Sequence, residues 1–184
     1  MIDNTAIIGD DVFISDDCFI RPFCNIMSGA RIGKGCRLGQ NVVMLPGSVL
    51  GDRCKVQNNV SLFTGVECSD DVFIGPSVTF TNVINPRAFI ERKTEYKKTI
   101  VKEGATIGAG AVIICGCVIG RYSMIGAGSV VTKNVPDYSL VAGNPARQIG
   151  WVSKHGHTLR FESGRATCPE TGEVYFLSDL EKNV

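Results

Sequence analysis

Apolar residues recur along this chain with a period of six. One stands at every sixth position from Ile2 to Phe80, and the series resumes 21 positions later, from Val101 to Val131. Within each six-residue unit the second residue is often Gly, the next two are turn-forming residues, and the fifth is small. A period of six fits neither an α-helix nor a simple alternating strand, so these twenty units indicate a repeat architecture.

The repeat predicts a short strand, a sharp corner and another strand in every six residues. Gly, Asn and Asp dominate the fourth place of the unit, and these residues accept a positive φ at low cost. Three strands then close one triangular coil of eighteen residues, and about seven coils stacked at roughly 4.8 Å give a prism roughly 30 Å tall. We therefore predict an all-β, left-handed parallel β-helix over residues 1–147, with one external loop at 81–100.

The remaining residues, 148–184, do not follow the repeat. The segment 148–156 is expected to cap the open end of the prism. Alternating apolar residues on either side of the turn-forming run 167–172 predict a short β-hairpin. We treat this part as a small C-terminal β extension that serves as a cap or an oligomer contact.

Composition narrows the function classes. Nineteen basic residues nearly balance eighteen acidic ones, so the overall charge favours neither nucleic acid nor an anionic membrane. No basic segment followed by an apolar run opens the chain, and no apolar stretch is long enough to span a bilayer. The expectation is a soluble cytoplasmic protein.

Eight cysteines raise the question of disulfides or zinc. Most of them occupy repeat positions that point inward, where a thiol acts as a small hydrophobic group and suggests a reducing compartment. Cys117 takes such a position while Cys115 lies at a corner, so the two are not expected to share a metal. The histidines, His155 and His157, both follow the prism, which argues against a three-histidine zinc hydratase and leaves them as solvated tail residues or a weaker base or metal pair.

The interruption of the repeat, Thr81–Thr99, is polar and basic. The repeat does not need it, so it is where function is expected. Asn82 lies at its start. Because positions eighteen apart stack, Asn82 shares a column of outward corner residues with Pro46 and Thr64, and Asn58 shares another with Pro76. Asn82 is either a plain turn residue or a group held rigidly for chemistry. The basic residues are either anion ligands or partners of Glu91 and Glu95; they are Arg87, Arg92, Lys93, Lys97 and Lys98.

The prism, its single external loop and the run Gly143-Asn144-Pro145-Ala146-Arg147 resemble the hexapeptide acyltransferases over about residues 1–155. That resemblance implies a homotrimer with acetyl-coenzyme A (acetyl-CoA) in the groove between neighbours and an external loop that closes the acceptor site. Many members of that family use a histidine base, which the prism of this chain lacks. A sugar amine with a pKa near 8 is partly neutral at cytoplasmic pH. It therefore needs orientation more than a base, and Asn82 is the candidate to orient it.

Several runs sharpen the resemblance: Lys55–Ser61, Phe80–Arg87, Ile90–Lys93 and Gly104–Gly108. They resemble bacterial N-acetyltransferases that act on the 3-amino group of UDP-2-acetamido-3-amino-2,3-dideoxy-D-glucuronate for lipopolysaccharide O-antigen. The resemblance implies that Asn82 positions the amine, that Arg92 contacts substrate and that the departing thiolate takes the proton. The residues expected to bind the substrate, a uronate with a pyrophosphate and a carboxylate, are Gln57, Asn58, Arg87, Glu91 and Arg92.

Acetyl-CoA is the expected co-substrate, and no metal is expected. Ala109 and Ala127 are small corner residues eighteen apart, which leaves room for a pantetheine arm, and Lys133 and Arg147 are candidates to bind its phosphates. Two alternatives stay open. One is a dTDP-3-amino-3,6-dideoxyhexose N-acetyltransferase, whose substrate lacks the carboxylate, and the other is a non-catalytic β-helix scaffold.

Overall fold

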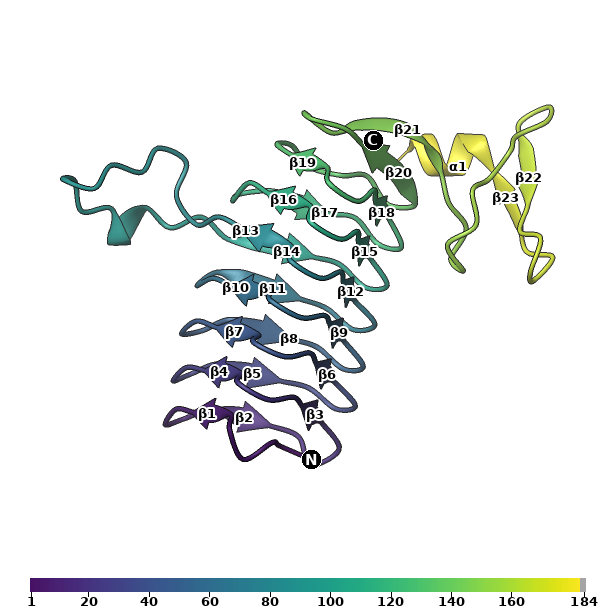
Figure 1. Ribbon diagram of the computed structural model, residues 1–184. Coiled ribbons are helices and arrows are strands. Elements are labelled where there is room, and N and C mark those ends of the chain that lie inside the picture. Colours follow the sequence, from purple (N-terminus) through teal and green to yellow (C-terminus); the bar gives the residue numbers. More distant parts are fainter. Residues whose placement is uncertain (183–184) are drawn as a thin grey trace.

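The computed structural model describes residues 1–182, which wind into a triangular prism with the N-terminus at one end (Figure 1). Three parallel sheets form its faces, and up to β19 each successive strand of the chain belongs to the next sheet. Sheet I contains β1 (Ile7–Ile8), β4 (Asn25–Ile26), β7 (Val43–Met44), β10 (Ser61–Leu62), β13 (Thr79–Phe80), β16 (Val112–Ile113) and β19 (Val130–Val131). Sheet II contains β2 (Phe13–Ile14), β5 (Arg31–Ile32), β8 (Val49–Leu50), β11 (Val66–Cys68), β14 (Thr99–Val101) and β17 (Val118–Ile119).

Sheet III completes the prism and extends past it. It contains β3 (Phe19–Ile20), β6 (Arg37–Leu38), β9 (Lys55–Val56), β12 (Phe73–Ile74), β15 (Thr106–Ile107), β18 (Met124–Ile125), β20 (Ser139–Ala142) and β21 (Arg147–Trp151). Pairing runs from each residue to the one eighteen later, as in Ile26 with Met44. The predicted all-β, left-handed parallel β-helix of hexapeptide repeats is therefore confirmed.

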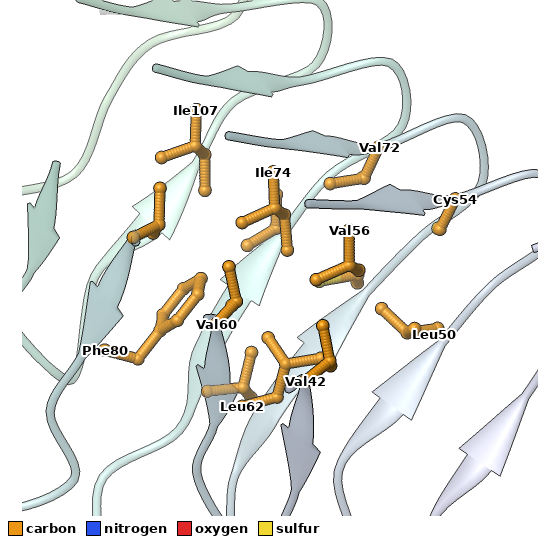
Figure 2. Close-up of a cluster of buried hydrophobic side chains, with 14 of the residues drawn as sticks. Val42, Leu50, Cys54, Val56, Val60, Leu62, Val72, Ile74, Phe80 and Ile107 are labelled. Atoms are coloured by element: carbon orange, nitrogen blue, oxygen red, sulfur yellow. The ribbon is translucent and has the colours of Figure 1, made fainter. Parts of the chain in front are cut away.

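The core is a single column of apolar side chains along the prism axis (Figure 2). The large residues of the repeat are almost fully enclosed from Ile20 to Val131, and the small residues of the fifth place fill the space beside them. Figure 2 shows the alternation within neighbouring coils, with Leu50, Val56 and Leu62 as large residues and Cys54 and Val60 as smaller ones. Each coil buries its apolar residues against the coils above and below it, so the coils stabilise one another.

The corners follow the predicted chemistry. Asn41, Asn59 and Asp71 take φ values of 58°, 60° and 59° at the fourth place of their units. The structure also places Arg53 (φ 57°) and Tyr122 (φ 52°) in this region, where a side chain larger than Asn is uncommon. The second place is often Gly because the next coil passes directly over it: a Cβ on Gly108 would lie 2.5 Å from the backbone nitrogen of Ala127.

All eight cysteines are buried free thiols. The repeat predicts this for six of them, whereas Cys115 is expected at an exposed corner and Cys168 lies outside the repeat; Cys115 is only 3% exposed. Cys18, Cys24, Cys36 and Cys54 each donate a hydrogen bond to a backbone carbonyl fifteen residues later, at 3.0 to 3.1 Å between sulfur and oxygen. Burial raises the pKa of the Cys68 thiol to about 12. These thiols therefore serve as small, hydrogen-bonded core groups.

The C-terminal part continues from the last coil. The antiparallel strand β21 covers the edge of sheet III beside β20, and the Asn144–Pro145 peptide bond before it is cis. The predicted hairpin is formed by β22 (Arg165–Thr167) and β23 (Val174–Phe176). A short helix, α1 (Leu177–Glu181), follows it, and the repeat analysis did not predict this helix. Within residues 1–182, no helix is both long and apolar enough to cross a bilayer. Residues 183 and 184, which end the predicted 148–184 segment, lie outside the described residues.

The external loop leaves the prism after Phe80 and rejoins it at Thr99. Val66 pairs with Thr99, which is thirty-three residues later, whereas paired residues in the coils before the insertion are eighteen apart. The strands on either side of the insertion therefore keep their register. The loop contains one short 3-10 helix, η1 (Lys93–Glu95), and projects from the side of the prism away from the C-terminal hairpin (Figure 1). The repeat thus continues above and below a segment that it does not shape.

Candidate active site

The three edges of the prism differ in chemistry. We call the edge between sheets I and II the loop edge, because its corners include Thr64 and Asn82, where the external loop begins. The edge between sheets II and III is the charged edge, with Arg53, Asp71 and Arg121 at its corners. The edge between sheets III and I is the alanine edge, and its corners include Asn58, Pro76, Ala109 and Ala127.

A cavity of about 260 Å³ lies where the external loop meets the loop edge. Four of the predicted site residues line it: Asn82, Arg87, Glu91 and Arg92. Tyr96 also lines it, and the sequence analysis did not select that residue. Tyr96 lies in the interrupted stretch, where no periodicity indicates which side chains turn inward.

The backbone holds Asn82 firmly. Its carbonyl oxygen accepts a 2.9 Å hydrogen bond from the backbone nitrogen of Lys97, which closes the base of the loop. Its neighbour Thr81 accepts a 2.9 Å bond at Oγ1 from the backbone nitrogen of Cys115 in the next coil. Within residues 1–182 the side-chain amide of Asn82 forms no hydrogen bond, so both of its polar atoms are available to a ligand.

Arg92 is the most enclosed charged side chain of the loop. Its Nη1 donates to both carboxylate oxygens of Glu95, at 2.8 and 2.9 Å, and its side chain is 20 % exposed. In the described part of the chain its Nε is buried without a hydrogen-bond partner. A buried donor without an acceptor costs about 1–3 kcal/mol, so an acceptor brought by a ligand would stabilise this arrangement.

Two lysines of the loop also form ion pairs, one with the expected partner and one with another. Lys93 lies 3.3 Å from Glu91, and both side chains are mostly exposed. Lys98 pairs with Glu67 on sheet II. Exposed pairs of this kind contribute little to stability. Lys93 and Lys98 thus match the interpretation of solvated, ion-paired loop residues.

Gln57 and Asn58 lie on the alanine edge, one prism face away from Asn82. They line a separate cavity of about 590 Å³. Asn58 Oδ1 accepts a 2.9 Å hydrogen bond from the backbone nitrogen of Gln40 one coil below. A single copy of the chain therefore does not bring these two amides to Asn82, although the sequence grouped them as ligands of one substrate.

The residues predicted to bind acetyl-CoA lie in two separate places on the prism. Ala109 and Ala127 are exposed at successive corners of the alanine edge, where they form a narrow wall above Asn58 and Pro76. Lys133 and Arg147 line a third cavity, of about 260 Å³, at the C-terminal end of the prism. Lys133 lies two coils above Asn82 on the loop edge, so it and the alanine wall belong to different edges, whereas Arg147 pairs with Ala142 at the end of sheet III.

The largest of these cavities contains residues that the sequence analysis did not select. Phe19, Arg21 and Arg37 line it together with Gln57 and Asn58. Their positions eighteen apart in the repeat would have placed Phe19 and Arg37 next to each other on the outer face of sheet III. The spacing of eighteen residues that groups the corner residues is therefore also the sequence signal for this outward pair.

The histidines lie away from all three cavities. His157 Nε2 is 2.7 Å from Glu170 Oε2 in the C-terminal extension. In residues 1–182 no cluster of three or more His, Cys, Asp or Glu side chains is arranged to hold a metal ion.

Two family models match the repeat. The model described as "Bacterial transferase hexapeptide (six repeats)" matches residues 11–45 and 98–133, and the model described as "Hexapeptide repeat of succinyl-transferase" matches residues 29–64. Both stretches of the first model lie in the prism, one on each side of the external loop. The matches therefore follow the same units that the period of six identifies.

Among curated proteins, the chain is 49% identical over 84 residues to a dTDP-3-amino-3,6-dideoxy-alpha-D-galactopyranose 3-N-acetyltransferase of Aneurinibacillus thermoaerophilus. That match covers 46% of this chain and 43% of the relative. A galactoside O-acetyltransferase of Lactococcus lactis is 36% identical over 45% of this chain and 41% of its own length. The chain thus spans less than half the length of these relatives.

A solved structure has the same fold. A hexapeptide transferase family protein from Anaplasma phagocytophilum aligns with a TM-score of 0.64 over 81% of this chain and 85% of its own, at 21% identity. Its likeness supports the architecture alone. Taken together, the matched repeats and the stacked six-residue units show that the prism consists of hexapeptide repeats of the kind that these bacterial transferase models describe.

Proposed function

We propose that the protein is an N-acetyltransferase that moves the acetyl group of acetyl-CoA to the 3-amino group of a nucleotide-linked sugar. The observation that carries this proposal is the unpaired Asn82 amide in the loop cavity beside Arg87 and Arg92. The 49% identical relative, which is named for that reaction on a dTDP-linked 3-amino sugar, supports the same chemistry.

In the proposed reaction Asn82 acts as an orienting group. Its Oδ1 accepts a hydrogen bond from the sugar amine and aims the nitrogen lone pair at the thioester carbonyl. The new C–N bond forms, the C–S bond breaks, and the departing CoA thiolate takes the proton from nitrogen. Orientation of this kind can replace a strong base, because an amine with a pKa near 8 is already partly neutral.

The site is proposed to form between two copies of the chain in a homotrimer. The loop cavity offers an amine-orienting amide, and the alanine edge offers a smooth wall for pantetheine, yet a whole prism face separates them in one copy. Apposition of one copy's loop to its neighbour's alanine edge would complete the site. Lys133 and Arg147 are proposed to contact the phosphates of CoA at the C-terminal end.

For the sugar, two observations favour a dTDP-3-amino-3,6-dideoxyhexose over the UDP-linked uronate that the motifs first suggested. The 49% identical relative is named for a dTDP-linked sugar. In addition, Glu95 already occupies Arg92 Nη1 with both oxygens, so a uronate carboxylate would have to compete for that cation. The UDP-linked uronate, and with it a role in O-antigen synthesis, stays the second candidate because the loop is rich in basic residues.

Acetyl transfer to a panel of sugar nucleotides tests the proposal. Release of the CoA thiol is followed with acetyl-CoA and each sugar, and mass spectrometry locates the acetyl group. We expect kcat/KM for the dTDP-3-amino-3,6-dideoxyhexose to exceed that for the UDP-linked uronate by about 10-fold or more. A sugar nucleotide with a hydroxyl at C3 serves as the control. A higher kcat/KM for the uronate would reverse the substrate assignment. If no amine is acetylated, the proposed activity is wrong and the alternative of a non-catalytic scaffold is favoured.

A further inference from the structure

The largest cavity described above lies outside the loop and has a composition of its own. It opens on the outer face of sheet III at the alanine edge, in the N-terminal half of the prism, and has a volume of about 590 Å³. Its lining combines Phe19, two arginines and three side-chain amides. We call this cavity the sheet III groove.

Positive charge gathers on this face without a direct ion pair among residues 1–182. Arg37 lies in register between Phe19 below and Lys55 above, so two like charges are direct neighbours on adjacent strands. Such a pair is destabilising unless an anion lies between or over it. None of the ion pairs among residues 1–182 involves Arg21, Arg37 or Lys55, whereas Arg53 on the nearby charged edge pairs with Asp71.

An aromatic ring and free amide groups accompany the charges. The guanidinium carbon of Arg37 lies 5.3 Å from the centre of the Phe19 ring, which is 42% exposed. Asn58 uses its Oδ1 on the backbone nitrogen of Gln40, which leaves its amide N–H groups free to point outward. Nucleic-acid bases stack on planar aromatic rings. Arginine donates paired hydrogen bonds to a diphosphate, and side-chain amides form hydrogen bonds with the polar edge of a base.

The height of the groove along the prism indicates what it holds. Its corner residues, Gln40 and Asn58, lie below Pro76, while Ala109 and Ala127 continue the same edge above. Asn82 leaves the prism between these two levels, immediately after β13. A nucleotide sugar with its diphosphate in the groove would therefore extend upward to the level of Asn82, where it would meet a thioester descending along the alanine wall.

From these features we infer that the sheet III groove binds the nucleoside-diphosphate moiety of the acceptor, with Arg21 and Arg37 on the diphosphate and Phe19 against the base or ribose. This inference rests on the proposed function, because it assigns the acceptor's nucleotide to one copy and its amine to the loop of the neighbouring copy. It adds specificity-determining residues that lie outside the external loop.

The binding of UDP and dTDP to the purified protein, measured by titration calorimetry, tests the inference directly. Arg37→Ala removes a charge-assisted contact and is expected to raise the Kd of both nucleotides about 10- to 100-fold. Phe19→Leu keeps an apolar side chain but loses the ring, and we expect a rise of about 10-fold. Both side chains point outward, so thermal unfolding should be close to that of the wild type.

Sheet II offers a matched control. Phe13 and Arg31 form the same in-register pair one face earlier, at the same level of the prism, but the next strand there carries Val49 instead of Lys55. Phe13→Leu and Arg31→Ala should leave the Kd of UDP and dTDP within about 2-fold of the wild type. Equal losses in the sheet II and sheet III variants would show a general charge effect and overturn the inference.

Kinetics separate this inference from the proposed function. With a sugar nucleotide that is acetylated, Arg37→Ala should raise the KM of the sugar nucleotide about 10-fold or more and leave the KM of acetyl-CoA unchanged. A rise in the KM of acetyl-CoA instead would assign the groove to the CoA diphosphate and overturn the inference. Absence of UDP and dTDP binding to the wild type would overturn it as well.

The two proposals can also fail separately. Nucleotide binding that depends on Arg37, without acetyl transfer to any amine, would support the groove and contradict the enzyme. Acetyl transfer that is indifferent to Arg37 and Phe19 would support the enzyme and contradict the groove.

Discussion

The loop edge and the alanine edge are built by the same repeat, yet they present opposite surfaces. At the loop edge the insertion adds an open cavity with charged walls and an amide that has no hydrogen-bond partner within residues 1–182. At the alanine edge the upper corners are small, and Ala109 and Ala127 stand eighteen residues apart with nothing larger than a methyl group. One edge can orient a reacting group, and the other can support an extended chain.

The difference shows why a single prism is an incomplete catalyst in our proposal. A rigid column of coils keeps its edges apart by the width of a sheet, so no side-chain motion within one copy joins Asn82 to the alanine wall. A symmetric assembly solves this, because each copy can offer its loop to one neighbour and its wall to the other.

The third edge, by contrast, carries exposed charged groups that pair with one another between coils. Arg53 donates from Nε and Nη2 to the two carboxylate oxygens of Asp71, both at 2.8 Å, one coil above it. Arg121 and Tyr122 contact Glu103 in the same way. Ion pairs thus link successive coils where neither loop nor wall is present.

The largest effect is expected at the loop edge. Asn82→Ala should lower kcat for acetyl transfer about 10²- to 10³-fold, because an orienting contact to the reacting nitrogen is lost. The measurement is steady-state kinetics together with a thermal melt. Asn85→Ala is the control, since Asn85 lies in the same loop but does not line the cavity. Equal activity of the Asn82 variant and the wild type would remove Asn82 from the mechanism.

A mixing experiment tests whether the two edges come from different copies. Ala127→Trp is expected to block the wall while the coil stays folded, because this corner is exposed and its φ is not positive. Neither this variant nor Asn82→Ala should be active alone. After unfolding and refolding together, a trimer with shared sites should regain about a quarter of wild-type activity. If activity does not return although mixed oligomers form, each site belongs to one copy.

The smallest effect is expected at the charged edge. The Arg53 guanidinium holds the pKa of Asp71 below its usual value, so the pair stabilises the fold above the unfolded-state pKa of about 3.9 and loses its effect as pH falls through the lower, folded-state value. Arg53→Asn keeps a residue that accepts positive φ and removes the charge. We expect a lower Tm than the wild type at pH 7 and a difference that shrinks toward pH 3. A constant difference in Tm across that range would rule out the ion pair as its cause.

Much of the prism could be predicted from the residues alone because inward and outward positions in a hexad are set by local geometry. The burial of Cys54 and Leu62, the positive φ of Asn59 and the column through Asn82 all follow from counting in sixes. The family resemblance assigned Gln57 and Asn58 to one substrate with Asn82, whereas counting already put Asn58 and Asn82 in different columns, and a prism face separates them in a single copy. The helix α1 escaped prediction because a single turn lacks a periodic signal.

The amino-acid pattern thus accounts for the stacked coils, the place where they are interrupted and the buried free thiols, since each depends on a short-range preference repeated many times. Folding in three dimensions settled the rest. Glu95 pairs with Arg92, Tyr96 lines the loop cavity, and Lys98 pairs with Glu67 on sheet II. These contacts arise where the chain leaves its period or where side chains from separate coils stack, and there the outcome depends on which groups can reach one another in space.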